Sequence, residues 1–257
     1  MLFEARGLTK RFGGLTAVSD VTFDIGEGEI VGIFGPNGSG KTTTLSLIAG
    51  MLAPTSGELL WNGQRIVGRR PFEIAGMGII KTFQNPQLFP ELTVLDHMCI
   101  ASHLGFKRAL GMNRVKTLFW PYAGRAVERG AEKKMDEMLA LCRLTEVSEE
   151  KAAALSYGAE KMLGVAMAMM CDPKLLLLDE PASGLGQEEI VNLETVLRDL
   201  RAHGVTLCII DHKVSFLGRL ADRSIALAHG VVIAQGSTRD VLANPDVVEA
   251  YLGRKHA

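Results

Sequence analysis

Residues suited to binding phosphate occur in one run near the start of the chain. The run consists of Gly35, Pro36, Asn37, Gly38, Ser39, Gly40, Lys41 and Thr42, with Thr43 next. It fits the pattern G-x-x-x-x-G-K-[ST], in which glycines let backbone N–H groups turn towards phosphate oxygens. The lysine ammonium reaches the β- and γ-phosphates and the hydroxyl binds Mg²⁺. We therefore predict that residues 35–43 bind a nucleotide, with Lys41 as a catalytic residue and Thr42 as a metal ligand.

Two carboxylates at the end of an apolar run complete the chemistry. Residues 175–178 are all leucine, and Asp179 and Glu180 follow directly. A carboxylate at a strand tip suits Mg²⁺, and the next one is placed to polarise an attacking water. An ordinary exposed strand end is the structural alternative, but the phosphate loop disfavours it. We predict a P-loop nucleotidase in which Asp179 ligates the metal and Glu180 activates the water.

The elements that position these residues alternate along the chain. Residues 29–34 predict a strand and 41–51 the helix that follows the loop, while 174–178 and 205–210 predict further buried strands. Between the last two lies an amphipathic helix that Gly204 can end, its apolar face formed by Ile190, Leu193, Val196, Leu197 and Leu200. Strand, helix, strand in that order predicts a parallel sheet with right-handed crossovers.

The rest of the chain predicts two additions to this α/β core. Residues 58–61 and 64–67 flank Asn62-Gly63, a pair typical of a tight hairpin, and favour an N-terminal antiparallel β subdomain. Residues 87–154 show helical periodicity and predict a helical subdomain. The expected organisation is a single domain over 1–257, with 1–86 and 155–257 forming the core and 87–154 the insertion.

Composition restricts the partners and the cellular compartment to be expected for the protein. The net charge is −1 over 257 residues, which argues against a nucleic-acid partner. The start of the chain has no apolar segment typical of a signal peptide, and no apolar stretch is long enough to span a bilayer. The four cysteines are isolated among apolar residues, which predicts buried, reduced thiols and a cytoplasmic setting.

Further motifs resemble those of the ABC ATPases over nearly the whole chain. Residues 155–159, Leu-Ser-Tyr-Gly-Ala, take the place of the family signature, and residues 183–185 that of the D-loop. Gln84 in Thr82-Phe83-Gln84 is similar to the Q-loop glutamine, His212 to the switch histidine, and Phe12 to the aromatic that stacks on adenine. Each of these alone is more often structural, and their order around the two strong motifs reverses that judgement.

The resemblance implies the ABC ATPase fold and a role for each residue. ATP and Mg²⁺ are the expected ligands. Phe12 is expected to stack on the adenine and His212 to contact the γ-phosphate, while Gln84 senses the metal and couples the ATPase to the permease. Two ATPase chains close head to tail, so Ser156 and Gly158 are expected to contact the ATP of the partner.

Within the family, the chain most resembles the ATP-binding subunits of branched-chain amino acid uptake systems. The similar residues include 11–15, 81–84 and the C-terminal stretches 244–246 and 250–253. This implies a peripheral subunit on the cytoplasmic face of the membrane. Its expected partners are permease subunits and either a second, related ATPase or a copy of itself. A substrate-binding protein is an indirect partner. Urea, amide and aromatic-acid systems look alike here. An exporter of lipid or polysaccharide, a soluble ABC ATPase without a transporter and a regulatory subunit that barely hydrolyses ATP are the alternatives.

The sequence departs from the family pattern at and near the signature. It reads Ser-Tyr-Gly-Ala-Glu rather than Ser-Gly-Gly-Gln, and Met167, Gly186 and Lys213 replace the usual Arg, Asp and Asp. Our hypothesis is asymmetric activity, in which the phosphate loop and Glu180 are competent while the partner's nucleotide meets a weakened signature.

Overall fold

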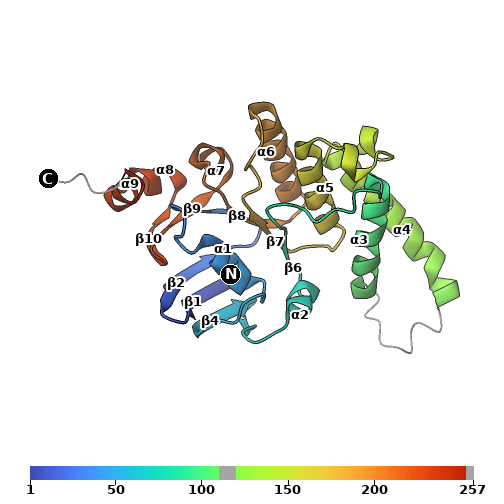
Figure 1. Cartoon of the computed structure of the whole chain (residues 1–257). Coiled ribbons are helices and arrows are strands. Elements are labelled where there is room, and N and C mark those ends of the chain that lie inside the picture. Colours follow the sequence, from blue (N-terminus) through green and yellow to red (C-terminus); the bar gives the residue numbers. More distant parts are fainter. Residues whose placement is uncertain (110–119, 253–257) are drawn as a thin grey trace. The chain divides into compact units, whose positions relative to one another are not determined.

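The computed structural model describes residues 1–109 and 120–252, and Figure 1 shows their helices and strands. The chain divides into two compact units. The sheet unit comprises Met1–Gln84, Lys174–Ser183 and Leu197–Ala257, and the helical unit comprises Asn85–Pro173 and Gly184–Val196. The helical unit takes in residues on both sides of the predicted insertion 87–154, of which 110–119 lie outside the described residues. The predicted domain boundaries therefore stay a prediction.

An antiparallel sheet forms the N-terminal part of the sheet unit. Its strands are β1 (Phe3–Phe12), β2 (Leu15–Ile25), β4 (Ser56–Trp61) and β5 (Gln64–Arg65), in the order β2-β1-β4-β5. The predicted hairpin joins β4 to β5, and Asn62 and Gly63 have the positive φ angles of a type I′ turn, 48° and 75°. The antiparallel β subdomain is thus confirmed.

The second sheet carries the strands that lead to the candidate site. Its order is β10-β9-β3-β8-β7-β6, formed by β3 (Ile30–Phe34), β6 (Ile79–Lys81), β7 (Leu175–Asp179), β8 (Thr206–Ile210), β9 (Arg223–Ala228) and β10 (Val231–Gly236). All neighbours are parallel except β10, which pairs antiparallel with β9. The predicted parallel pairing is confirmed for β7 and β8. The edge strand β10, which the sequence did not predict, is antiparallel because His229 and Gly230 adopt φ angles of 48° and 81° and close a tight hairpin.

The main core lies between the two sheets and helix α1 (Lys41–Ile48). Alternate residues of the parallel strands, such as Ile33 and Leu177, contribute to the same cluster as Phe3 of the antiparallel sheet and Leu45 of α1. Helix α1 ends three residues before the predicted Met51, because Gly50 takes a φ of 68° that a helix does not continue. The remaining helices of the sheet unit are α2 (Pro71–Gly76), α7 (Val214–Leu220), α8 (Thr238–Ala243) and α9 (Pro245–Leu252).

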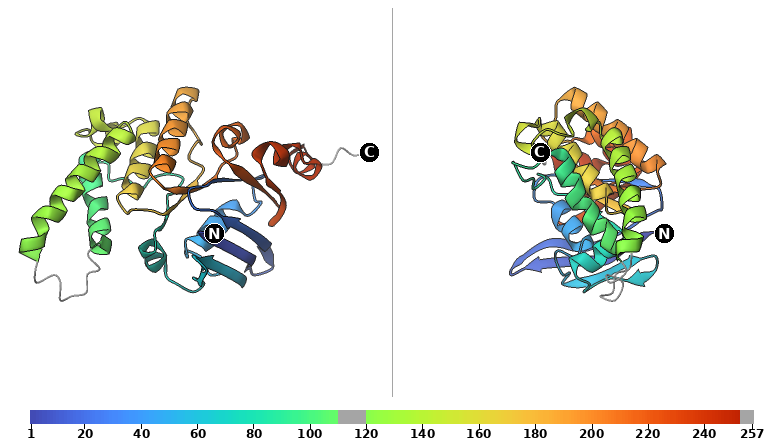
Figure 2. Two further views of the ribbon diagram at one scale, coloured as in Figure 1. Left: turned by 180° about the vertical axis from the view of Figure 1, so that it is seen from behind. Right: turned by 90° about the vertical axis from the view of Figure 1, so that its right-hand side faces the viewer.

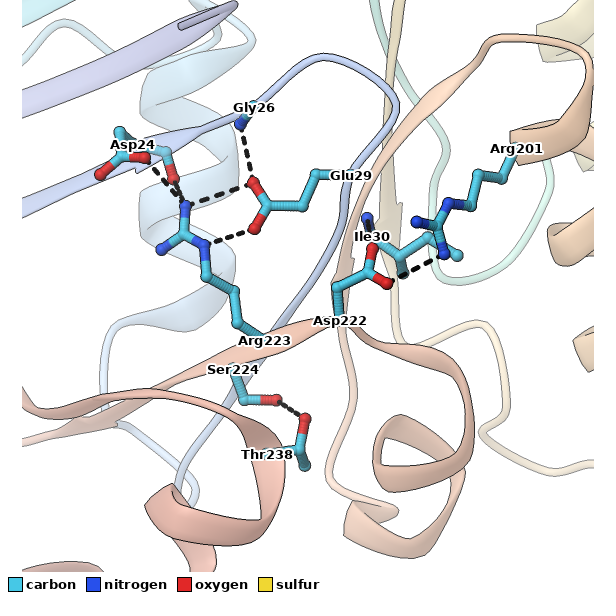
Figure 3. A network of polar contacts seen from close by, with 9 residues as sticks. All are labelled: Asp24, Gly26, Glu29, Ile30, Arg201, Asp222, Arg223, Ser224 and Thr238. Atoms are coloured by element: carbon cyan, nitrogen blue, oxygen red, sulfur yellow. Dashed lines mark hydrogen bonds and ion pairs between the residues drawn. The ribbon is translucent and has the colours of Figure 1, made fainter.

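A polar network fixes the start of β3, the strand that delivers the phosphate loop (Figure 3). Asp222 accepts a hydrogen bond from the N–H of Ile30 at 2.9 Å and pairs with Arg201 at 2.9 Å. Arg223 joins Glu29 to Asp24, and Glu29 also accepts the N–H of Gly26 at 2.7 Å. These contacts hold the beginnings of β3 and β9 in register, so the far end of β3 is placed as well.

The helical unit is built from α3 (Val94–Ala109), α4 (Trp120–Leu141), α5 (Tyr157–Met169) and the first part of α6 (Gln187–Ala202). Helices α3, α4 and α5 contact one another, and both views of Figure 2 show them side by side. The apolar face predicted for α6 is buried. Among the cysteines, Cys142 and Cys208 are buried, and burial raises the pKa of each thiol to about 12. The burial predicted for Cys99 is wrong: it is exposed, because the helical period turns Met98 inwards and Cys99 outwards. Cys171 is only half-buried.

Candidate nucleotide site

The phosphate loop lies between the end of β3 and the start of α1, as predicted. A Cβ added to Gly35 would lie 2.0 Å from the carbonyl oxygen of Leu227, and one added to Gly40 would lie 2.4 Å from that of Ala17. Gly40 also adopts a φ of 97° directly before α1. Only glycine fits at these two positions, so the loop packs its backbone tightly against its neighbours.

Lys41 is folded back into the loop. Its Nζ donates to the carbonyl oxygens of Gly35 at 2.9 Å and Pro36 at 3.0 Å, and the residue is 6% exposed. Burial lowers the pKa of Lys41, while the charges of Glu180, Asp179 and Asp211 act in the opposite direction. The ammonium is held by weak acceptors, which phosphate oxygens can replace with stronger, charge-assisted bonds.

Ser39 provides an observation that favours an anionic ligand. Within the described part of the chain, its Oγ is the buried side-chain polar atom that has no hydrogen-bond partner. Buried hydroxyls without partners are rare, because the lost hydration is not replaced. A loop that combines this hydroxyl, an adjacent ammonium and a helix start fits a phosphate group.

Asp179 lies at the tip of β7, beside Thr42. The hydroxyl of Thr42 is 3.4 Å from Oδ1 of Asp179, while Nζ of Lys81 is 3.0 Å from Oδ2. Hydroxyl and carboxylate oxygens are the ligands that Mg²⁺ prefers, so these two of the three predicted metal residues fit a Mg²⁺ ion. Sequence reasoning missed Lys81, whose only signal is one cation at the end of an apolar strand.

Glu180 contacts two other predicted residues. The Nε2 of Gln84 donates to its Oε2 at 2.8 Å, and Nδ1 of His212 lies 3.7 Å from the same oxygen. Glu180 adopts a φ of 50°, and its N–H donates to the carbonyl oxygen of Ile210 at 2.8 Å. The structure thus brings together three residues that are far apart in sequence, around one carboxylate next to the metal pair.

Asp211 is a second residue that sequence reasoning missed. It is fully buried, and its two carboxylate oxygens accept the N–H groups of Ala182 at 3.0 Å and Lys213 at 2.8 Å. It therefore links the loop after β7, which carries Glu180, to the loop after β8, which carries His212. The one sign of it in the sequence is its position directly before the candidate histidine, His212.

Two aromatic residues of the sheet unit are relevant to the nucleotide elements: Phe12 precedes the phosphate loop in sequence, and Tyr251 contacts the strand that leads to it. Phe12 ends β1; the residue is 45% exposed, and the Lys10 ammonium lies 5.0 Å from its ring centroid. Tyr251 of α9 packs on Phe34, the last residue of β3, with ring centroids 6.3 Å apart. Burial raises the pKa of Tyr251, and the backbone hydrogen bond from Gly35 lowers it. The C-terminal helix is thereby joined to the start of the phosphate loop.

The signature residues lie in the helical unit, at the start of α5. Ser156 is the N-cap, and its Oγ accepts the N–H of Ala159 at 3.2 Å. A Cβ added to Gly158 would lie 2.3 Å from Oε1 of Glu189, whose Oε2 accepts the N–H of Gly186 at 2.8 Å. The hydroxyl of Tyr157 is 3.1 Å from the Asn85 amide oxygen. A pocket of about 170 Å³ within this unit borders Ser156, Gly158, Ala159 and Glu189.

Comparison with known proteins identifies the family. The sequence profile of the ABC transporter family matches residues 18–183, which is more than half of the chain. The chain belongs to the ABC transporter family. A second profile, described as branched-chain amino acid ATP-binding cassette transporter, matches residues 231–257. As an ABC cassette, the protein is an ATP-hydrolysing enzyme.

Individual relatives cover the ABC cassette almost completely. The chain is 37% identical over 253 residues to the high-affinity branched-chain amino acid transport ATP-binding protein BraF of Pseudomonas aeruginosa, covering 98% of both chains. It is 36% identical over 254 residues to LivG of Escherichia coli, a protein of the same description, again with 98% of both covered. The solved ATP-binding cassette MJ1267 is 30% identical, with a TM-score of 0.83 and coverage of 98% of this chain and 99% of that chain. The predicted family and the predicted fold class are both confirmed.

Proposed function

We propose that this ABC cassette lies at the cytoplasmic face of a cell membrane. There it hydrolyses ATP to drive the uptake of branched-chain amino acids, or of closely related small amides and acids. The observation that carries the proposal is the pair of family matches on one chain. The general ABC match covers the nucleotide elements, and the branched-chain match covers the C-terminal segment that contains Tyr251. Relatives named for branched-chain amino acid transport, at 35–37% identity over the whole chain, support the same substrate class.

The nucleotide elements then have assigned roles. The loop N–H groups, the Ser39 hydroxyl and the ammonium of Lys41 bind the phosphates, and Phe12 stacks on the adenine. Thr42, Asp179 and Gln84 hold Mg²⁺, which supplies charge neutralisation of the phosphates when bound. Glu180 orients the attacking water and His212 contacts the γ-phosphate. Positioning and charge stabilisation of this kind supply most of the acceleration in phosphoryl transfer.

The partners follow from the family organisation. In the part of the chain that the structure describes, no helix is both long and apolar enough to cross a membrane. We propose that separate permease subunits provide the membrane path and that a binding protein delivers the substrate to them. The cassette MJ0796 was solved as a dimer, at 25% identity and a TM-score of 0.76. We propose a second, related ATPase as the partner of this chain, with Ser156 and Gly158 facing the nucleotide of that partner.

Co-purification from the cell of origin tests the proposal. The tagged chain is recovered from gently solubilised membranes and its partners are identified by mass spectrometry. Two permeases and a second ATPase are the expected partners, and vesicles containing the complex should accumulate leucine, isoleucine or valine with ATP. Accumulation of urea or an aromatic acid instead would change the substrate class. A lipid-exporting permease, or recovery without any membrane protein, would overturn the proposal. The ATP hydrolysis rate of the complex tests the regulatory alternative.

A further inference from the structure

Lys81 is a cation with a largely buried side chain, and none of these roles uses it. It is the last residue of β6, which pairs with β7 in the register Lys81 to Leu177. Its side chain is 9% exposed, and its Nζ lies 3.0 Å from Oδ2 of Asp179, whose side chain is 6% exposed. Two opposite charges buried this deeply stabilise each other, because removal of either leaves the other without compensation.

The pair leaves the two oxygens of Asp179 in different surroundings. Oδ2 lies against the Lys81 ammonium, while Oδ1 faces the hydroxyl of Thr42 at 3.4 Å. Lys81 thus fixes the rotation of the Asp179 carboxylate so that Oδ1 points to Thr42, another of the predicted metal residues. It also balances the charge of Asp179 without any bound metal.

The same ammonium opposes a divalent cation. A second positive charge beside Asp179 would lie within a few ångströms of Lys81, in surroundings where water screens charges poorly. Other groups of the site are also satisfied within the chain: Lys41 by the carbonyl oxygens of the loop and Glu180 by Gln84. A divalent cation that arrives with a triphosphate brings enough negative charge to offset the repulsion from Lys81. A divalent cation that arrives alone does not.

We propose that Lys81 is a positioning residue that orients Asp179 towards Thr42 and keeps divalent cations out of the nucleotide-free site, so that the metal enters only with the nucleotide. The proposal rests on the assignment of Asp179 as a metal residue. It concerns binding in the absence of nucleotide, a property that the hydrolysis rate alone does not report.

Binding of Mn²⁺ alone to the nucleotide-free full-length chain tests the proposal, with free Mn²⁺ followed by electron paramagnetic resonance. Lys81→Met removes the charge and keeps much of the apolar stem. It should bind Mn²⁺ at least about tenfold more tightly than the original chain, since one like charge next to the site is gone. Lys81→Arg keeps the charge and should stay within about twofold. Lys174→Met, at the opposite end of the adjacent strand, is the matched control and should also leave the affinity unchanged.

Two further variants separate the possible failures. Lys81→Gln should repeat the result of Lys81→Met with a polar side chain, and it replaces that variant if the methionine prevents folding. Adding Asp179→Asn to Lys81→Met should abolish the gain in affinity. Equal Mn²⁺ affinity in the original chain and in Lys81→Met or Lys81→Gln would overturn the role of Lys81 alone. A gain that survives Asp179→Asn, or ATP binding that Mg²⁺ does not alter in the original chain, would overturn the metal assignment itself.

Discussion

The phosphate-loop region of the sheet unit and the signature region of the helical unit use their polar groups in different ways. In the first, Lys41, Asp179 and Glu180 carry charges that other residues of the chain neutralise or bond. The buried Ser39 hydroxyl has no hydrogen-bond partner among the residues that the structure describes. In the second, Ser156 and Glu189 support the starts of two helices. The first region is arranged to exchange internal partners for a ligand. The second is arranged mainly to hold its own backbone.

This difference gives a structural basis to the hypothesis of asymmetric activity. The carboxylate of Glu189 lies against Gly158, the residue that we propose to face the partner's anionic nucleotide. Ala159 replaces the usual glutamine of the signature and offers only its backbone, whose N–H is bonded to Ser156. We therefore expect changes in the phosphate-loop region to reduce turnover more than changes in the signature region.

The largest effect is expected for Glu180→Gln. The amide oxygen can still accept the hydrogen bond from Gln84, so the fold and ATP binding should persist. The lost negative charge should lower steady-state ATP hydrolysis of the assembled complex by about 10²–10³-fold. Glu27→Gln, on an exposed turn, is the control that should leave the rate unchanged. A loss below tenfold in the first variant would contradict the role of Glu180.

An intermediate effect is expected for Gly158→Ala. The new methyl group would meet Oε1 of Glu189 at 2.3 Å and displace a carboxylate that also supports Gly186. The free energy of unfolding should fall by about 1–3 kcal/mol, as for other overpacked sites. In a Glu189→Ala background, the penalty of the same change should shrink to less than half, as urea unfolding can measure. An undiminished penalty would show that another contact is responsible.

The smallest effect is expected for Ser156→Ala. It removes the N-cap hydrogen bond of α5, which corresponds to about 1 kcal/mol of stability. Turnover of the complex should fall much less than in Glu180→Gln, because the hypothesis of asymmetric activity assumes a signature that is already weakened. Ser237→Ala removes the matching N-cap of α8 and controls for the loss of stability alone. Equal losses of turnover from Ser156→Ala and Glu180→Gln would refute the asymmetry.

The sequence was sufficient for features that depend on residues close together in the chain. The phosphate loop, the carboxylates after β7 and the Asn62-Gly63 hairpin follow local rules of backbone geometry. The antiparallel β10 was missed because the turn before it has His229 at its first position, where Asn, Asp or Gly is the usual signal of a tight hairpin. Lys81 and Asp211 were missed for another reason: their partners are far away in sequence, and only the sheet order brings them together.

The position of β3 in its sheet has a consequence for how the protein is made. Its neighbours β8 and β9 come late in the chain, and Ile30 pairs with Leu207, 177 residues further on. At 5–20 residues per second, a ribosome needs roughly ten to thirty-five seconds to supply that partner. Tyr251, which contacts Phe34 and Gly35, is made later still. The phosphate loop therefore reaches its final surroundings long after its own residues have been synthesised.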